Sequence, residues 1–420
     1  MKWRNQILAL LCLLIFVAFG VLYFRNWVVQ KPFGIVLFIG EGLTPDRLAA
    51  TRLYAGGATT RLAIESLPAM ALLSNYSADF AVPDEAAAAT TLATGVKVNN
   101  RSLGLGPNEK RLRTIIDLAR DNGRAIGIVT DGRLTNPCLA AFYANGKADV
   151  GQQLADEKKV DIALGGGSAE FLPEAKGGHR SDSRDLILEM RRNGYEIVRT
   201  KAELETIPQW RRPKLLGFFS EEEMAHANEI TAGSEEPSLA DMTRRAIQLL
   251  QWNTGGYLLI VDAGLMRTAA RENEGEETLA ETVQLDHAIE IANRYIGSKS
   301  TLLVAGNFGI GGLSLNGFPF RRDSGVAILG FDSSGEPALT WATGPNGTPA
   351  RNALPAQPLD GPSPPEEGPN ARAQEPAAAY APAARNTVDD VLAAGRGPGT
   401  EVLHGFQDNT IIFKIIADQL

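Results

Sequence analysis

Histidine and cysteine are scarce in this chain of 420 residues, which has four histidines and two cysteines. Imidazole is the usual nitrogen ligand of zinc, so four histidines are few for a protein that holds more than one zinc ion. Cys12 lies in an apolar N-terminal segment, which leaves Cys138 without a partner for an internal disulfide in the rest of the chain. Basic residues are not in excess, and the net charge of −8 argues against a nucleic-acid partner.

One long apolar segment is present, at residues 7–24, with Lys2 and Arg4 before it and Arg25 after it. Its length is close to that of a bilayer span and exceeds the apolar part of a typical signal peptide. The positive N-terminus predicts that this end stays inside while the rest of the chain is exported. Residues 18–20 offer a cleavage site, but an uncleaved anchor is favoured because the residues that follow stay apolar. We therefore expect a membrane-anchored protein whose main domain is periplasmic or extracellular.

Apolar runs and helical patterns alternate along the rest of the chain. The runs are typical of buried parallel strands and lie at residues 33–39, 125–130, 160–164, 195–199, 215–219, 257–261 and 301–305. This alternation predicts an α/β fold with a mostly parallel central sheet. Ligand sites of such sheets lie at the carboxyl ends of the strands, where Glu41, Asp131, Asp262 and Asn307 fall.

Composition changes in the last quarter of the chain. Residues 344–384 are rich in proline, alanine, glycine and glutamate and show almost no periodicity, which predicts a disordered insertion. The predicted organisation is therefore an N-terminal anchor or signal segment at 1–32, an α/β domain at 33–343, the insertion at 344–384 and the end of the domain at 385–420. Residues 408–420 are expected to form a terminal helix.

Residues 83–95, with the sequence PDEAAAATTLATG, predict a helix that Asp84 caps. The run resembles the nucleophile segment of the alkaline phosphatase family, usually written T-D-S-A-A-A-A-T-A-L-A-T-G-V-K. Residues 37–42 (LFIGEG) resemble L-L-I-G-D-G, residues 161–167 (DIALGGG) resemble D-V-x-L-G-G-G, and residues 311–317 (GGLSLNG) resemble the stretch after D-H-E-T. The resemblance implies the alkaline-phosphatase-like three-layer sandwich, with helices on both faces of the sheet.

The family's chemistry uses a serine nucleophile, two zinc ions about 4 Å apart, a magnesium ion and a phosphate-binding arginine. The resemblance places Glu85 where the serine would stand. It places Glu41 at the first metal-binding carboxylate, and Glu41, Cys138 and Asp262 together at what is left of the magnesium site. Lys147 is a weak candidate for the position of the arginine.

The resemblance also implies that most metal ligands have been replaced. The degenerate positions are Asn136, Arg267, Arg271, Asn307, Phe308 and Asn386. A guanidinium keeps its proton at any working pH and repels a cation, a phenyl ring has no donor atom, and a neutral amide is a poor zinc ligand. No zinc is therefore expected, and a weak single Mg²⁺ or Ca²⁺ site is the remaining metal option, although thiol is a poor ligand for such ions.

Two hypotheses follow for the altered site. In one, Arg267 and Arg271 neutralise Glu41, Glu85 and Asp262, the carboxylates that metal ions neutralise in the family. In the other, the two arginines are simply solvated. For function, the replacements favour a catalytically inactive pseudophosphatase that binds an unidentified ligand or protein partner. The alternatives are an active phosphatase with an altered metal centre and a scaffold that works through its insertion. The family resemblance suggests a dimer.

Overall fold

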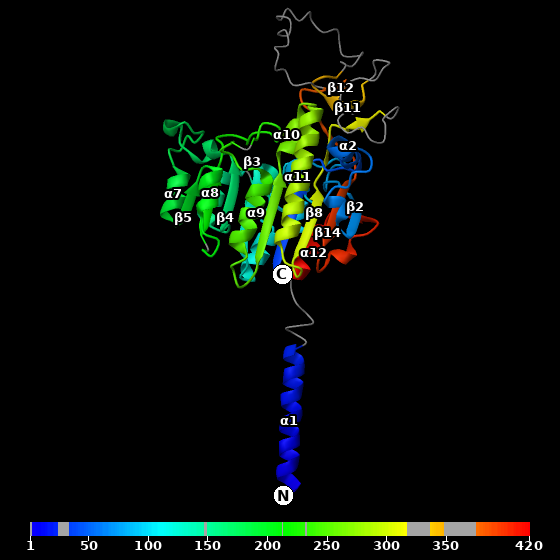
Figure 1. The fold of residues 1–420 in the computed structure, drawn as a ribbon. Helices are drawn as coiled ribbons and strands as arrows, with labels where there is room; N and C mark the ends of the chain where they lie inside the picture. The colour runs from blue at the N-terminus through cyan, green and yellow to red at the C-terminus, as the bar shows by residue number, and fades with distance from the viewer. Residues whose placement is uncertain are drawn as a thin grey trace, which may run out of the picture.

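The computed structural model describes residues 2–23, 33–146, 149–211, 213–231, 233–316, 337–347 and 375–420. The strands of its main sheet are β1 (Gly34–Gly40), β2 (Ala69–Ser74), β3 (Ala125–Arg133), β4 (Ile162–Gly166), β5 (Tyr195–Val198), β6 (Lys214–Phe218), β7 (Tyr257–Ala263), β8 (Thr301–Gly306), β14 (Val391–Arg396) and β15 (Phe406–Asp408). Their order is β15-β2-β14-β8-β1-β7-β3-β4-β6-β5 (Figure 1). β14 is antiparallel to β2 and β8, and the other paired neighbours are parallel. The predicted mostly parallel sheet is confirmed.

Helices cover both faces of this sheet. They are α2 (Pro45–Gly56), α3 (Glu85–Thr94), α4 (Ile115–Asp121), α5 (Pro137–Ala140), α6 (Val150–Glu157), α7 (Leu186–Arg192), α8 (Lys201–Thr206), α9 (Leu239–Leu250), α10 (Leu265–Arg271), α11 (Gly275–Tyr295) and α12 (Ile411–Gln419). Side chains of β1 alternate between two hydrophobic cores because successive residues of a strand point to opposite faces. Leu37 packs with α3, α4, α5 and α12, whereas Phe38 packs with α9 and α11. The structure is thus the three-layer sandwich that the sequence predicts.

A small lobe stands at the carboxyl ends of the main strands (Figure 1). It contains a three-stranded sheet of β10 (Ser314–Leu315), β11 (Leu339–Gly344) and β12 (Ala377–Tyr380), and a pair made by β9 (Gly309–Ile310) and β13 (Asn386–Thr387). β12 runs parallel to β11, and Ala384 is buried in a third hydrophobic cluster. Residues 344–347 and 375–384 are therefore folded, so the predicted limits of the insertion at 344–384 are wrong at both ends. Its central part, 348–374, lies outside the described residues.

The N-terminal apolar segment forms the single helix α1 (Lys2–Tyr23). Within the described residues, it is the one helix long and apolar enough to cross a membrane, and the spanning stretch Trp3–Val21 has no side chain buried against the rest of the chain. A helix of this kind at the start of a chain serves either as a membrane anchor or as a signal sequence.

Three strands at one side of the sheet, β15, β2 and β14, lie where no strand was predicted, and β15 is the edge strand. β2 alternates buried and exposed residues (AMALLS), and β14 is built largely of small residues (VLAAGR). Alanine and methionine favour helix over strand, so local sequence is a poor guide here. Both strands form because β14 pairs with β8 and β2 with β14, extending the sheet beyond its parallel part.

Candidate functional site

Three of the four polar residues predicted at the carboxyl ends of the strands meet at one place. Glu41 follows β1, Asn307 follows β8, and Asp262 lies near the end of β7 beside Ile39. All three side chains are completely buried. The parallel register of β8, β1 and β7 brings residues far apart in sequence to the same edge of the sheet.

Helix α3 places Glu85 over this edge. The Asp84 side chain caps the helix by accepting the backbone N–H of Ala87 at 2.8 Å, and Glu85 is the first helical residue. Gly95 ends the helix in the left-handed conformation that glycine adopts without strain. The alanines between these ends allow close packing against α5, and Ala87, Ala88 and Ala89 are buried. The predicted capped helix is confirmed, and its first turn directs a carboxylate into the site.

Two arginines of α10 hold this carboxylate. Arg267 Nη1 donates to Glu85 Oε2 at 2.9 Å, and Arg271 Nη2 donates to Glu85 Oε1 at 2.9 Å. The two arginines are four residues apart and so lie on the same side of the helix. Each carboxylate oxygen thus has its own guanidinium. The solvated alternative for Arg267 and Arg271 is wrong, since both side chains are paired with Glu85.

Arg271 also connects α10 to the small lobe. Its Nη2 donates to Asn386 Oδ1 at 2.7 Å, and its Nη1 donates to the carbonyl oxygen of Ala384 at 2.6 Å. Asn386 in turn donates its amide to the carbonyl oxygen of Pro83 at 2.8 Å, just before α3. Asn386, a position predicted to have lost a zinc ligand, therefore serves as a hydrogen-bond link between Arg271 and the start of α3.

Arg267 contacts two further carboxylates. Its Nε lies 3.5 Å from Glu41 Oε2, and its Nη2 lies 3.4 Å from Glu223 Oε1. Thr268 also donates to Glu223 at 2.7 Å. Burial acts to lower the pKa of Arg267, but Glu41, Glu85 and Glu223 outweigh it and raise this pKa above its ordinary value. Arg267 is thus a fixed cation among three acids.

Sequence reasoning missed Glu223 as a member of this network. The available signal was the acidic run at residues 221–223, which follows β6 and so lies at the carboxyl edge of the sheet. Position at that edge would have marked the run as a candidate, but it could not have said which of the three glutamates faces Arg267.

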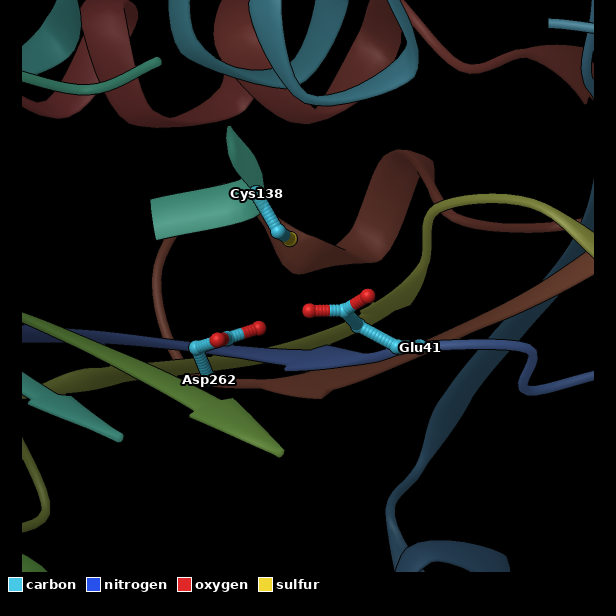
Figure 2. Close-up of side chains that lie close together, drawn as sticks. All are labelled: Glu41, Cys138 and Asp262. Atoms are coloured by element: carbon cyan, nitrogen blue, oxygen red, sulfur yellow. The ribbon is translucent and has the colours of Figure 1, made fainter. Parts of the chain in front are cut away.

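Glu41, Asp262 and Cys138 form a buried group beneath Arg267. Figure 2 shows the two carboxyl groups facing each other, with the Cys138 sulfur pointing toward them, and one ligand atom from each lies within 4.8 Å of the others. Thr130 donates to Asp262 Oδ2 at 3.0 Å. Neither Glu41 oxygen receives a hydrogen bond from an N–H or hydroxyl donor in the described residues.

Burial raises the pKa of Glu41 well above its usual range, Arg267 opposes the shift, and the charges of Asp262 and Glu85 add to it. Burial also raises the pKa of Asp262, although hydrogen bonds from Cys138 and Thr130 oppose this rise. Burial raises the pKa of the Cys138 thiol well above its usual range, and Asp262 and Glu41 raise it further. Two carboxyl groups this close cannot both carry a charge at low cost. Burial and the nearby acids therefore favour the uncharged form of Glu41, which Arg267 opposes.

Asn307 and Phe308 are fixed by local contacts. Asn307 donates its amide to Cys138 Sγ at 3.2 Å and accepts the backbone N–H of Phe308 at 2.8 Å. Phe308 is buried in the hydrophobic cluster that also contains Ala88 and Ala270. Phe308 therefore extends the apolar core. Asn136 precedes α5 and is largely buried, and Lys147 lies outside the described residues.

The residues present do not fit two zinc ions. The guanidinium of Arg267 lies between Glu41 and Glu85, and that of Arg271 lies against Glu85 and Asn386, so both would repel a cation there. The remaining group of Glu41, Cys138 and Asp262 offers two carboxylates and one thiol, and the thiol would have to lose its proton to bind a metal ion. Mg²⁺ prefers a shell of oxygen ligands and water, so the thiol of Cys138 makes this group a poor magnesium site, and the weak single site stays a prediction.

The fold and the site together define an α/β sandwich with a charged polar cluster at the carboxyl ends of a mostly parallel sheet. The family model described as alkaline phosphatase matches residues 34–420. The chain belongs to the alkaline phosphatase family.

Two curated relatives carry the same family name. A membrane-bound alkaline phosphatase of Bombyx mori is 29% identical over 381 residues, which cover 76% of this chain and 68% of the relative. The tissue-nonspecific alkaline phosphatase of Gallus gallus is 27% identical over 444 residues, which cover 90% of this chain and 82% of the relative. Among solved structures, alkaline phosphatase from the Antarctic bacterium TAB5 superposes with a TM-score of 0.72 at 18% identity, over 93% of this chain and 98% of that one. This likeness shows the shared fold.

Proposed function

We propose that this protein is a pseudophosphatase: a member of the alkaline phosphatase family that does not hydrolyse phosphate esters and instead binds a ligand or protein partner. One observation carries the proposal. The residue at the position of the nucleophilic serine, Glu85, is a carboxylate whose two oxygens are each held by a guanidinium at 2.9 Å.

The ion pairs oppose catalysis in two ways. A carboxylate that accepts charge-assisted hydrogen bonds on both oxygens is a weak nucleophile, since attack would require it to give up these bonds. It also fills the place between the two cations where a phosphate would have to bind. Glu85 thus neutralises the positive charge of Arg267 and Arg271, which is then not free to stabilise the transition state of phosphoryl transfer.

An active phosphatase with an altered centre is the competing function. The arrangement that favours it is the presence of two guanidiniums beside a carboxylate, because arginines can stabilise phosphoryl transfer without a metal ion. In that mechanism Glu85 would have to leave Arg267 and Arg271 and attack the phosphorus. The two functions therefore make opposite predictions for a variant that lacks the carboxylate.

Phosphate release by the full chain separates the two functions. The chain and its Glu85→Ala variant are produced in a host that lacks its own alkaline phosphatases and are assayed with p-nitrophenyl phosphate from neutral to alkaline pH. We expect both proteins to match the background of a mock purification. Turnover in the parent chain that Glu85→Ala abolishes would establish an active phosphatase in place of the proposed pseudoenzyme.

For localisation, we propose that α1 is an uncleaved anchor and that the main domain lies outside the cytoplasm. The support is the apolar stretch Trp3–Val21. Two basic residues stand at its N-terminal end, Lys2 just before it and Arg4 as its second residue. Protease added to intact cells or spheroplasts should digest the main domain while α1 stays with the membrane. Protection of the whole chain until lysis would reverse this orientation, and a soluble product lacking residues 1–20 would show cleavage.

A further inference from the structure

The parallel strands of the main sheet begin at one end of the domain, which we call the amino edge. The N-terminal helix is connected to the domain at this end. β1 begins at Gly34, and α1 ends at Tyr23, so the ten residues 24–33 connect them. Fully extended, ten residues reach about 35 Å. The start of β1 is therefore held within that reach of the end of α1, and the opposite end of the strands carries the Glu85–Arg267 site.

Tryptophans mark this amino edge. The chain has five tryptophans, of which Trp3 and Trp27 belong to the N-terminal segment, so three lie in the main domain. Trp341 of the small lobe is 1% exposed, whereas Trp210 is 70% exposed and Trp252 is 47% exposed. Trp210 precedes β6 and Trp252 precedes β7, which places both exposed tryptophans of the domain at the amino ends of parallel strands.

Two further aromatic residues and a cation share the edge. Phe33, directly before β1, and Tyr295, at the end of α11 before β8, are each more than one third exposed. Lys299 lies in the loop between α11 and β8 and is exposed. The C-terminus lies at this end of the domain as well (Figure 1), where the carbonyl oxygen of Gln419 accepts a hydrogen bond from Arg124.

Exposed tryptophan and tyrosine are enriched at the boundary between lipid and water, where the ring is buried and the N–H or O–H group stays hydrated. We propose that the amino edge of the sheet rests on the bilayer that holds α1, with Trp210 and Trp252 in the lipid headgroup region. The inference rests on the proposed anchoring by α1. It sets the orientation of the domain, because a domain seated in this way presents the Glu85 site away from the membrane.

Quenching of tryptophan fluorescence by lipid tests the proposal. The full chain with Trp3→Phe and Trp27→Phe is placed in phosphatidylcholine nanodiscs made with and without brominated acyl chains. We expect brominated lipid to reduce the emission of Trp210 and Trp252. A variant that adds Trp210→Phe and Trp252→Phe keeps Trp341 alone, and its emission should not change.

A matched control moves the fluorophore to the other edge. Phe80 is 60% exposed and lies between β2 and α3, at the carboxyl edge. Phe80→Trp in the variant that keeps only Trp341 should give emission that bromine does not reduce. Quenching of this introduced tryptophan without quenching of Trp210 and Trp252 would overturn the proposed orientation. The absence of quenching at both edges would overturn it as well.

The parent chain, which keeps Trp3, distinguishes an error in the proposed seating of the domain from an error in the proposed anchoring by α1. If Trp3 is quenched while Trp210 and Trp252 are not, α1 is in the membrane and only the seating of the domain is wrong. If the chain does not incorporate into nanodiscs, the proposed anchoring is wrong, and the inference is overturned with it.

Discussion

Arg271 Nη2 lies 2.9 Å from Glu85 Oε1, on the other carboxylate oxygen from the one that Arg267 holds at 2.9 Å. The two arginines come from α10 and the glutamate from the first turn of α3, so this contact joins segments more than 180 residues apart. The side chains are partly buried, with 21% of Glu85 and 27% of Arg271 exposed. Removing one partner of such a contact should lower the free energy of unfolding by more than breaking a surface pair and by less than breaking a fully buried one.

A double-mutant cycle on Glu85 and Arg271 should show clear coupling. We expect Glu85→Gln and Arg271→Met each to lower the free energy of unfolding by roughly 1–3 kcal/mol, because each leaves a partly buried charge with fewer partners. The double variant should cost roughly 1–2 kcal/mol less than the sum of the two. The measurement is urea unfolding. As a control, the exposed pair of Glu290 and Arg294 should show coupling of about 0.5 kcal/mol or less.

Removal of the Glu85 carboxylate should create an anion site. In Glu85→Ser, Arg267 and Arg271 lose their internal anion and face the N-terminus of α3, where free N–H groups also favour negative charge. Titration calorimetry should detect binding of inorganic phosphate to this variant and none to the parent chain. Adding Arg271→Met should abolish the binding. Binding of phosphate by the parent chain with equal affinity would mean that Glu85 does not fill the site.

The stability of the chain should fall as pH rises above the ordinary pKa of a glutamate, and Glu41 should contribute to this fall together with Asp131 and Asp262, whose pKa values burial also raises. Burial raises its pKa above the ordinary value of 4.5, with Asp262 and Glu85 adding to the shift and Arg267 opposing it. Between the two values the folded chain holds a proton that the unfolded chain has lost, so the free energy of unfolding decreases with pH. The slope from one such group is at most about 1.4 kcal/mol per pH unit.

Glu41→Gln should flatten this dependence, because the amide keeps a donor toward Asp262 but does not titrate. The test compares urea midpoints of the two chains from about pH 5 upward. An unchanged slope in Glu41→Gln would show that Glu41 does not contribute to this dependence.

Arg267→Asp should turn the buried acids into a metal site. The change removes the cation 3.5 Å from Glu41 and adds a carboxylate near Glu41 and Asp262. We expect Zn²⁺ or Mn²⁺ to raise the melting temperature of this variant and to leave that of the parent chain unchanged. Arg267→Met, which removes the charge without adding a ligand, is the control. Stabilisation of the parent chain by either ion would show that Arg267 does not exclude metal.

The central part of the fold could be predicted from sequence because its strands are continuous apolar runs buried on both faces, as in β1 and β7. The contacts of Arg267 and Arg271 with Glu85 were predictable because the motif of α3 and the spacing of the two arginines match a family pattern. The strands β2 and β14 were missed because their small residues favour no strand locally. Glu223 was missed because a run of three glutamates does not reveal which one faces inward.

The limits of the insertion were also mispredicted, for a physical reason. Residues 375–384 have the composition of a disordered segment, yet Glu375 accepts the backbone N–H of Gly275 at 2.6 Å and Ala377 is buried beside Trp341. These contacts come from distant parts of the chain, so composition could not predict them.

The metal content of the purified full chain tests most directly whether guanidinium groups have replaced the zinc ions of the family. The chain is produced with zinc in the medium, purified without chelators and analysed by inductively coupled plasma mass spectrometry beside Glu85→Ala. We predict far less than one zinc ion per chain in both proteins. One or more zinc ions per chain, with Arg267 and Arg271 intact, would contradict the replacement of zinc by guanidinium groups.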